Sequence, residues 1–199
     1  MTSTARELDG KIALVTGASR GIGRSAAFML ADAGATVAVH YGTSKPQADA
    51  VVAEIASRGG AAFAVQADLA VREGPASLFA ALDDELKRRF GSTSFDILVN
   101  NAGMGSGGVL ETVTEDELDR MVQINLKAPF RLIQLASPRL RDGGRIINVS
   151  STAVRVSQPR FVAYGPTKAA LESLTTILAV HFGPRNITVN AVRPEVHRE

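Results

Sequence analysis

The sequence predicts an α/β fold in which a doubly wound, Rossmann-like parallel sheet lies between two layers of helices. Six short runs rich in β-branched residues alternate with five longer helical patterns. The short runs are apolar almost throughout, which is typical of parallel strands buried on both faces. This alternation favours right-handed crossovers within one sheet, so we expect residues 1–199 to form a single three-layer domain.

Turn and capping residues delimit the expected elements. Thr114 and Glu117 have the spacing of a capping box, and Gly59 and Gly91 suit helix C-termini. Gly183, followed by proline, predicts the end of the last helix. The expected strands are 11–17, 35–41, 61–68, 95–103, 144–151 and 186–192, and the expected helices are 22–33, 46–58, 72–90, 114–140 and 165–182.

Composition narrows the classes of function. The 199 residues are 45% hydrophobic with a formal net charge of +2, as in globular proteins. The absence of cysteine excludes disulfides and thiolate sites, and the three histidines lack metal-ligand spacing, so we expect no metal. The basic run 87–89 follows acidic residues and suits a helix C-terminus better than a nucleic-acid surface. With no membrane-spanning run and no signal-peptide pattern, we expect a cytoplasmic protein.

A glycine-rich turn, TGASRGIG, follows the first expected strand and opens the first expected helix. Gly17 and Gly21 would permit a tight turn and a close approach to a pyrophosphate, and Gly23 would let the helix pack against the strand. The helix N-terminus would then donate N–H groups to the phosphates. An ordinary tight turn is the alternative, but the strand–turn–helix context favours dinucleotide binding.

Tyr164 and Lys168 are four residues apart at the start of the last expected helix, which places them on one helical face. Taken alone, such a pair is common on protein surfaces. Ser151, thirteen residues before the tyrosine, adds a hydroxyl at the end of a buried strand. A cation beside a phenol favours the phenolate, which suits a tyrosine to acid–base catalysis. Ser150 should point away from this group, because neighbouring strand residues face opposite sides.

These motifs, with NNAG at residues 100–103, resemble the short-chain dehydrogenase/reductase family over residues 8–194. The resemblance implies hydride transfer between NADP(H) and a carbonyl or secondary alcohol. Tyr164 would be the general acid/base, Ser151 would stabilise the oxyanion and Lys168 would also hold the nicotinamide ribose. The cofactor-binding residues that the resemblance implies are Gly17, Ser19, Arg20, Gly21, Ile22, Gly23, Tyr41, Asp68, Leu69, Asn101, Ala102, Gly103, Tyr164 and Lys168.

The cofactor preference follows from charge at the end of the second expected strand. Family members that use NAD carry an aspartate there, whereas this chain has Tyr41 and no nearby acidic residue. Arg20 and Lys45 are available to attract the 2′-phosphate of NADP(H). The alternative for Arg20 is a solvated loop residue.

Asn125 completes the catalytic set that the resemblance implies. Pro129, four residues later, has no N–H and leaves the Asn125 carbonyl without its usual helical partner. In the family, water bound at this asparagine relays protons to Lys168. The alternative is a mid-helix asparagine with a local or solvent contact.

The sequence departs from the family after Pro194, where the usual glycine is replaced by Glu195. We therefore expect a sheet truncated at its C-terminal strand and lacking the substrate lobe. Within the family, the chain most resembles a 3-oxoacyl-acyl-carrier-protein reductase, which would act on a carbonyl or acyl substrate. The alternative is a nucleotide-binding regulatory or scaffold protein with little turnover.

We also expect a homodimer or homotetramer formed through the helices at 114–140 and 165–182. These patterns contain more apolar residues than one sheet-facing side requires. A purely core role is the alternative for these residues, which are Leu132, Ile133, Leu135, Leu171, Leu174, Ile177 and Leu178.

Overall fold

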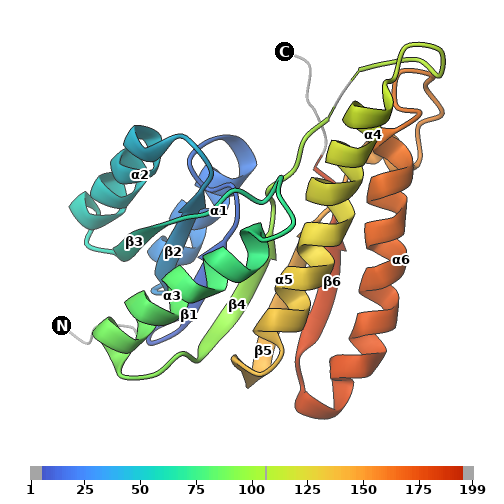
Figure 1. The fold of residues 1–199 in the computed structure, drawn as a ribbon. Helices are drawn as coiled ribbons and strands as arrows, with labels where there is room; N and C mark the ends of the chain where they lie inside the picture. The colour runs from blue at the N-terminus through green and yellow to red at the C-terminus, as the bar shows by residue number, and fades with distance from the viewer. Residues whose placement is uncertain (1–5, 106, 195–199) are drawn as a thin grey trace.

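A computed structural model describes residues 6–105 and 107–194, which form one six-stranded parallel sheet flanked by helices (Figure 1). The strand order is β3-β2-β1-β4-β5-β6, so the chain reverses its direction of winding between β1 and β4. This confirms the predicted doubly wound sheet. The strands are β1 (Ile12–Val15), β2 (Thr36–Tyr41), β3 (Ala61–Gln66), β4 (Phe95–Asn100), β5 (Leu140–Val149) and β6 (Thr188–Val192).

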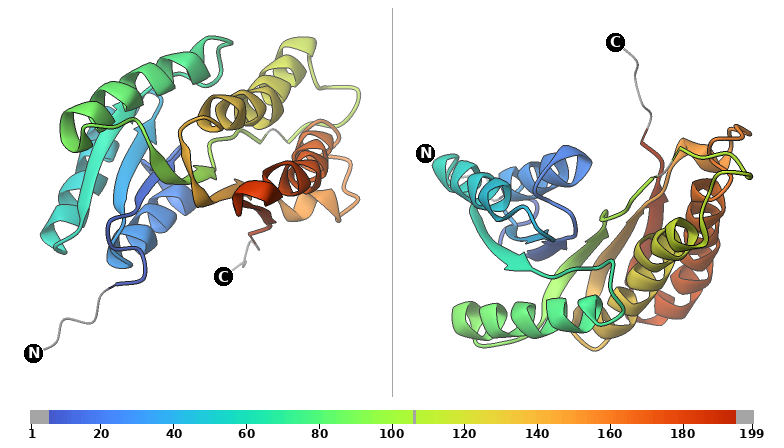
Figure 2. Two further views of the ribbon diagram at one scale, coloured as in Figure 1. Left: turned by 90° about the horizontal axis from the view of Figure 1, so that it is seen from below. Right: turned by 45° about the horizontal axis from the view of Figure 1, so that its top comes forward.

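Helices cover the two faces of the sheet in separate groups (Figures 1 and 2). Apolar residues of α1 and α2 pack on one face, and those of α3, α5 and α6 pack on the other. The helices are α1 (Gly21–Asp32), α2 (Lys45–Ser57), α3 (Gly74–Phe90), α4 (Glu115–Val122), α5 (Ala128–Ala136) and α6 (Tyr164–Phe182).

The predicted helix at 114–140 is wrong in two respects. A π-helical turn, η1 (Gln123–Lys127), separates α4 from α5, and the Ala128 N–H bonds the carbonyl five residues back. Pro129 lacks the N–H of a regular helix, which is consistent with this irregular turn. The helix also ends at Ala136, and β5 begins at Leu140 rather than at 144. Leu140 is buried against Phe95, so tertiary pairing extends the strand through the polar Arg-Asp-Gly-Gly segment.

Three of the capping signals in the sequence lie at helix ends in the structure. Thr114 and Glu117 form both hydrogen bonds of the capping box, and Gly91 caps α3 in the left-handed conformation at φ 68°. The α6 helix ends at Phe182, as Gly183 and the following proline predict, and Gly183 enters a 3-10 turn (Gly183–Arg185) with φ −50° rather than a left-handed cap. The left-handed residue is Asn186, at φ 53°.

A buried carboxylate, that of Asp96, links the strands at the sheet edge opposite their C-terminal ends. Asp96 is 3% exposed and accepts hydrogen bonds from the Ile12 N–H at 2.9 Å, Arg141 at 2.6 Å and Lys11 at 3.3 Å. A buried carboxylate needs such partners, and these join the starts of β1 and β4 to Arg141 of β5. These bonds hold the register of β1, β4 and β5. The opposite, C-terminal ends of the same strands carry the candidate site.

Two features bear on the predicted partners, namely the charge of the basic run at 87–89 and the length and hydropathy of the helices. Arg88 and Arg89 of the basic run both pair with Glu85, at 2.5 and 2.7 Å, so this one carboxylate offsets part of their charge. Within the described residues, no helix is both long and apolar enough to cross a membrane.

The apolar residues proposed to pair subunits divide between core and surface. Leu132, Ile133 and Leu171 are at most 2% exposed, so for these three the core interpretation holds and the surface prediction is wrong. Leu135, Leu174 and Leu178 are half-buried, and Ile177 is 63% exposed. The prediction about Glu195 lies outside the described residues.

Candidate active site

The glycine-rich loop between β1 and α1 provides an anion-binding helix N-terminus. Gly17 and Gly21 have φ values of 63° and 55°, a region that side chains other than glycine rarely adopt. A Cβ on Gly23 would overlap the Gly17 carbonyl and the Asn101 side chain. Arg20 precedes α1 in an extended conformation, and the first turn of α1 contains no acidic residue. The loop is therefore closely packed, and its helix dipole is available to a phosphate.

A cavity of about 390 Å³ lies where this loop meets the ends of β3 and β4. Such a place, beside the reversal of strand order, is the usual ligand-binding crevice of open α/β sheets. Ten of the predicted cofactor residues line it, namely Gly17, Ser19, Arg20, Gly21, Ile22, Asp68, Leu69, Asn101, Ala102 and Gly103. The lining also includes residues that the sequence did not indicate: His40, Gly42, Thr43, Ser44, Ala67 and Ile124.

Two residues predicted near the 2′-phosphate lie elsewhere. Tyr41 is 8% exposed, belongs to the apolar core between α1, α2 and the sheet, and does not line the cavity. Lys45 begins α2 and pairs with Asp49 at 2.6 Å, which raises the pKa of its ammonium group. Arg20 is the cation that lines the cavity, and β2 brings no carboxylate to it. These residues fit the 2′-phosphate of NADP(H) better than the free hydroxyl of NAD(H).

Thr16 joins the glycine-rich loop to the NNAG segment. Its hydroxyl donates to the Val99 carbonyl at 3.1 Å and accepts from the N–H groups of Asn101 and Ala102, at 2.9 and 3.0 Å. The Asn101 amide also donates to the carbonyls of Thr16 and Gly17, at 2.8 and 3.1 Å. The two walls of the cofactor cavity are thus held together by hydrogen bonds as well as by packing.

Lys168 and Tyr164 face each other at the start of α6. Lys168 is 4% exposed, and its Nζ donates to the Val149 carbonyl at 2.8 Å. The same Nζ lies 5.9 Å from the centre of the Tyr164 ring. Burial lowers the pKa of Lys168 to about 8, so the ammonium stays mostly protonated at neutral pH. The structure therefore brings the predicted tyrosine and lysine together at the C-terminal end of β5.

Ser151 and Ser150 follow β5 and have the different surroundings that the sequence predicts. The Ser151 Oγ accepts a hydrogen bond from the Ala153 N–H at 3.1 Å and starts a short 3-10 turn. The Ser150 hydroxyl instead donates to Glu172 at 2.5 Å, and Arg193 also pairs with this carboxylate. Ser150 thus has a structural role, which connects β5 with α6.

Asn125 lies within the π-helical turn and is fully buried. Its side chain accepts from the Met104 N–H at 3.0 Å and donates to the Met104 carbonyl at 2.8 Å and to the Thr167 hydroxyl at 3.1 Å. The alternative of a solvent-facing asparagine is therefore wrong. The proton relay through its carbonyl stays a prediction, whereas its side chain holds the segment after NNAG against α6.

Gly103 connects the cofactor cavity with the Tyr164–Lys168 pair. It lines the cavity, and a Cβ at this position would lie 2.9 Å from Asn125 Oδ1 and 3.4 Å from Lys168 Nζ. The absence of a side chain thus lets the lysine approach the cavity wall. Two of the predicted catalytic residues, Asn125 and Lys168, therefore lie beside the cofactor cavity at this glycine.

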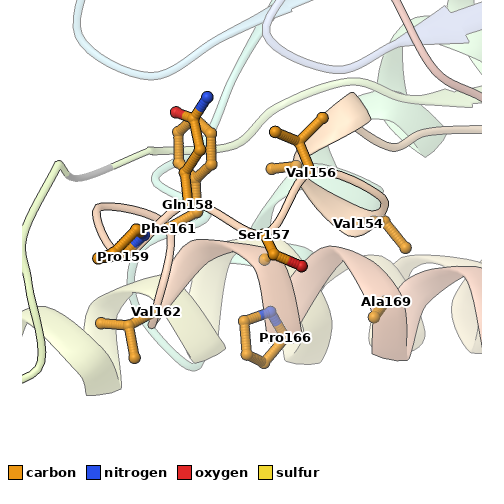
Figure 3. Close-up of a pocket in the computed structure, with 11 residues that line it drawn as sticks. Val154, Val156, Ser157, Gln158, Pro159, Phe161, Val162, Pro166 and Ala169 are labelled. Atoms are coloured by element: carbon orange, nitrogen blue, oxygen red, sulfur yellow. The ribbon is translucent and has the colours of Figure 1, made fainter.

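A second cavity, of about 520 Å³, lies beside the first turns of α6 (Figure 3). The segment 153–162 forms one wall with mostly apolar side chains, and Gly165, Pro166 and Ala169 form the other. These α6 positions lie on a different helical face from Tyr164 and Lys168. We therefore do not assign this cavity to the reaction.

Comparisons with known proteins agree with this geometry. The model of the short chain dehydrogenase family matches residues 11–198. The 3-oxoacyl-acyl-carrier-protein reductase FabG of Staphylococcus aureus is 45% identical over 186 residues, which are 92% of this chain and 73% of the relative.

Two solved structures are also similar. The angucycline C-6 ketoreductase LanV with bound NADP has a TM-score of 0.92 and 51% identity, covering 94% of this chain and 73% of LanV. The reductase LugOII, which catalyses keto-reduction at C1 during lugdunomycin biosynthesis, has a TM-score of 0.92 and 52% identity, covering 94% and 74%. This chain therefore belongs to the short-chain dehydrogenase/reductase family and is an NADP-dependent oxidoreductase.

Proposed function

We propose that this chain, as one cofactor-binding and catalytic domain, reduces a ketone with NADPH, using Tyr164 as the proton donor. The observation that carries this proposal is the junction at Gly103, where the cofactor cavity adjoins the buried Lys168 and Asn125. Lys168 in turn lies beside the Tyr164 ring. When bound, the cofactor supplies the hydride.

The side chains have separate tasks in this proposal. Tyr164 protonates the carbonyl oxygen as negative charge develops on it, and the Ser151 hydroxyl stabilises that charge. The Lys168 ammonium, held by the Val149 carbonyl, favours the phenolate left after proton transfer and holds the ribose hydroxyls. Asn125 fixes Met104 and Thr167 around this group and supports the proton relay.

We propose a polycyclic aromatic ketone, the chemical class of the angucyclines for which LanV is named a ketoreductase, as the first substrate class to test. The two ketoreductases named above are 51% and 52% identical to this chain, whereas FabG is 45% identical. Exposed apolar residues also lie in the segment after NNAG, including Val109 and Leu110. The second candidate is a 3-oxoacyl group on an acyl carrier protein, which the similarity to FabG favours.

The experiment is NADPH oxidation with a panel of polycyclic aromatic ketones and 3-oxoacyl thioesters, alongside NADPH binding by titration. Turnover of an aromatic ketone with little turnover of the thioesters is the expected result. The reverse preference would favour the carrier-linked substrate. Tight NADPH binding without turnover of any carbonyl would contradict the catalytic proposal.

We further propose that copies of the chain pair through α5 and α6 in the cytoplasm. Large apolar side chains are exposed on these helices, with Phe130 at 52%, Ile177 at 63% and Val180 at 80%. Burying them against a second copy would remove apolar surface from water. Sedimentation that shows only monomers at micromolar concentration would contradict this pairing.

A further inference from the structure

His40 occupies the end of β2 and uses both ring nitrogens on the main chain of the cofactor cavity. The Gly17 N–H donates to its Nδ1 at 3.0 Å, and its Nε2 lies 3.1 Å from the Ala67 carbonyl oxygen. Because an N–H can only donate and a carbonyl can only accept, the neutral ring must carry its proton on Nε2. The tautomer is therefore fixed by its partners.

The same residue also engages the next position of the glycine-rich loop. The main-chain carbonyl of His40 accepts from the Ala18 N–H at 2.8 Å. One residue thus satisfies the N–H groups of both Gly17 and Ala18, at the point where Gly17 takes its left-handed conformation. Through Ala67, the ring also holds the segment that leads into Asp68, on another wall of the cavity.

We infer that His40 is a positioning residue for the cofactor, which sets the start of the glycine-rich loop relative to the Ala67–Asp68 segment. This inference rests on the proposed cofactor site. His40 itself lines that cavity but is only 2% exposed, so its main contribution is to orient the backbone. Burial lowers the pKa of His40 to about 4, which keeps Nδ1 available as an acceptor at neutral pH.

Two substitutions distinguish the acceptor from the bulk of the ring. Asparagine places an amide oxygen close to the position of Nδ1 and can accept from Gly17, whereas leucine fills space without accepting. His40→Leu removes the acceptor of the Gly17 N–H, and the loss of one such hydrogen bond corresponds to about tenfold in an equilibrium constant. Val37→Ala, in the same strand and fully buried, is the matched control for destabilisation alone.

The experiment measures NADP⁺ affinity by calorimetry at neutral pH, and the melting temperature, for all four proteins. We expect His40→Leu to weaken binding about tenfold, His40→Asn to stay within about threefold, and Val37→Ala to lower the melting temperature without changing affinity. Equal affinity of His40→Leu and the unchanged chain would overturn the inference. So would equal loss in the leucine and asparagine variants, because the acceptor would then not matter.

A second measurement separates this inference from the proposed function. Imidazole ¹⁵N shifts of His40 should report the Nε2–H tautomer in the free protein, and an Nδ1–H tautomer would overturn the inference. Failure of the unchanged chain to bind NADP⁺ would instead overturn the proposed cofactor site. The ¹⁵N shifts would then still show whether the His40 ring carries its proton on Nε2, as its contacts with Gly17 and Ala67 require.

Discussion

The Nζ of Lys168 lies 5.9 Å from the centre of the Tyr164 ring while donating to the Val149 carbonyl at 2.8 Å. The strand end thus fixes a buried ammonium beside the phenol. One cation is placed both to influence the tyrosine and to reach the cofactor cavity past Gly103.

Replacing Lys168 by methionine should therefore impair two functions together. Methionine keeps much of the side-chain volume but removes the charge and the hydrogen-bond donors. We expect kcat for ketone reduction to fall at least a hundredfold and NADPH affinity to fall several-fold, as measured by steady-state kinetics and titration. Lys87→Met, on the exposed surface of α3, is the control and should change neither quantity. Unchanged NADPH affinity in Lys168→Met would argue against the ribose contact.

Replacing Arg20 by alanine should reduce the preference for NADPH over NADH. Arg20 lines the cavity and can make a charge-assisted contact with the 2′-phosphate, which is typically worth about 1.5–3 kcal/mol. The ratio of the two dissociation constants should therefore fall roughly tenfold or more.

Lys45→Ala provides the comparison, because Lys45 pairs with Asp49 and does not line the cavity. It should change the ratio much less than Arg20→Ala does. A larger effect at Lys45, or equal affinity of the unchanged chain for both cofactors, would contradict this assignment.

Gly23→Ala should disrupt the cofactor loop. The added methyl group would overlap the Gly17 carbonyl and the Asn101 amide, so backbone must move. We expect the melting temperature to fall and NADPH binding to be lost in the folded protein, both measurable by thermal shift with and without cofactor.

The matched control is Gly107→Ala. Among the described residues other than its chain neighbours, a Cβ at Gly107 would meet no atom within 4 Å, so this variant should bind NADPH normally. Normal binding by Gly23→Ala would show that the loop tolerates the methyl group and that the close packing is unimportant.

The stability of the fold should depend on pH through His40. Its folded-state pKa of about 4 lies below the ordinary value of 6.5 because burial outweighs both the Ala67 hydrogen bond and the nearby Asp68 carboxylate. The unfolded chain therefore binds a proton that the folded chain does not, between about pH 6.5 and 4. Across that interval the free energy of unfolding should decrease by about 3 kcal/mol as pH falls.

Urea denaturation at several pH values tests this dependence. Asparagine does not titrate, so the difference in unfolding free energy between the unchanged chain and His40→Asn should shift by about 3 kcal/mol between pH 6.5 and 4. Parallel curves for the two proteins would show that His40 does not titrate in this way.

The sequence predicted most of the fold because the relevant signals are local. Apolar runs locate the six strands, and the capping box at Thr114 locates a helix start. Leu140 was missed as a strand residue because its pairing with Phe95 is a tertiary contact, and the polar residues after it resemble a loop. The π-helical turn was not predicted, although Pro129 marked the irregularity.

In the candidate site, too, residues within local motifs could be predicted, whereas residues whose role depends on tertiary contacts could not. Linear motifs identified Gly17, Arg20 and Lys168, which the structure places around the cofactor cavity or beside it. His40 was missed because a single histidine in an apolar strand carries no motif, and its role depends on backbone groups at Gly17 and Ala67. Sequence position also could not show that Tyr41 packs in the core or that Lys45 pairs within its own helix.

The most direct test of the proposed mechanism is Tyr164→Phe, which removes only the phenolic hydroxyl from the ring beside Lys168. NADPH affinity by titration and ketone reduction by steady-state kinetics should be measured on the same preparation. We predict that affinity stays within about twofold, because the ring still packs, while the rate falls at least a hundredfold with the proton donor lost. A variant that retains more than about a tenth of the rate would contradict the assignment of Tyr164 as the general acid.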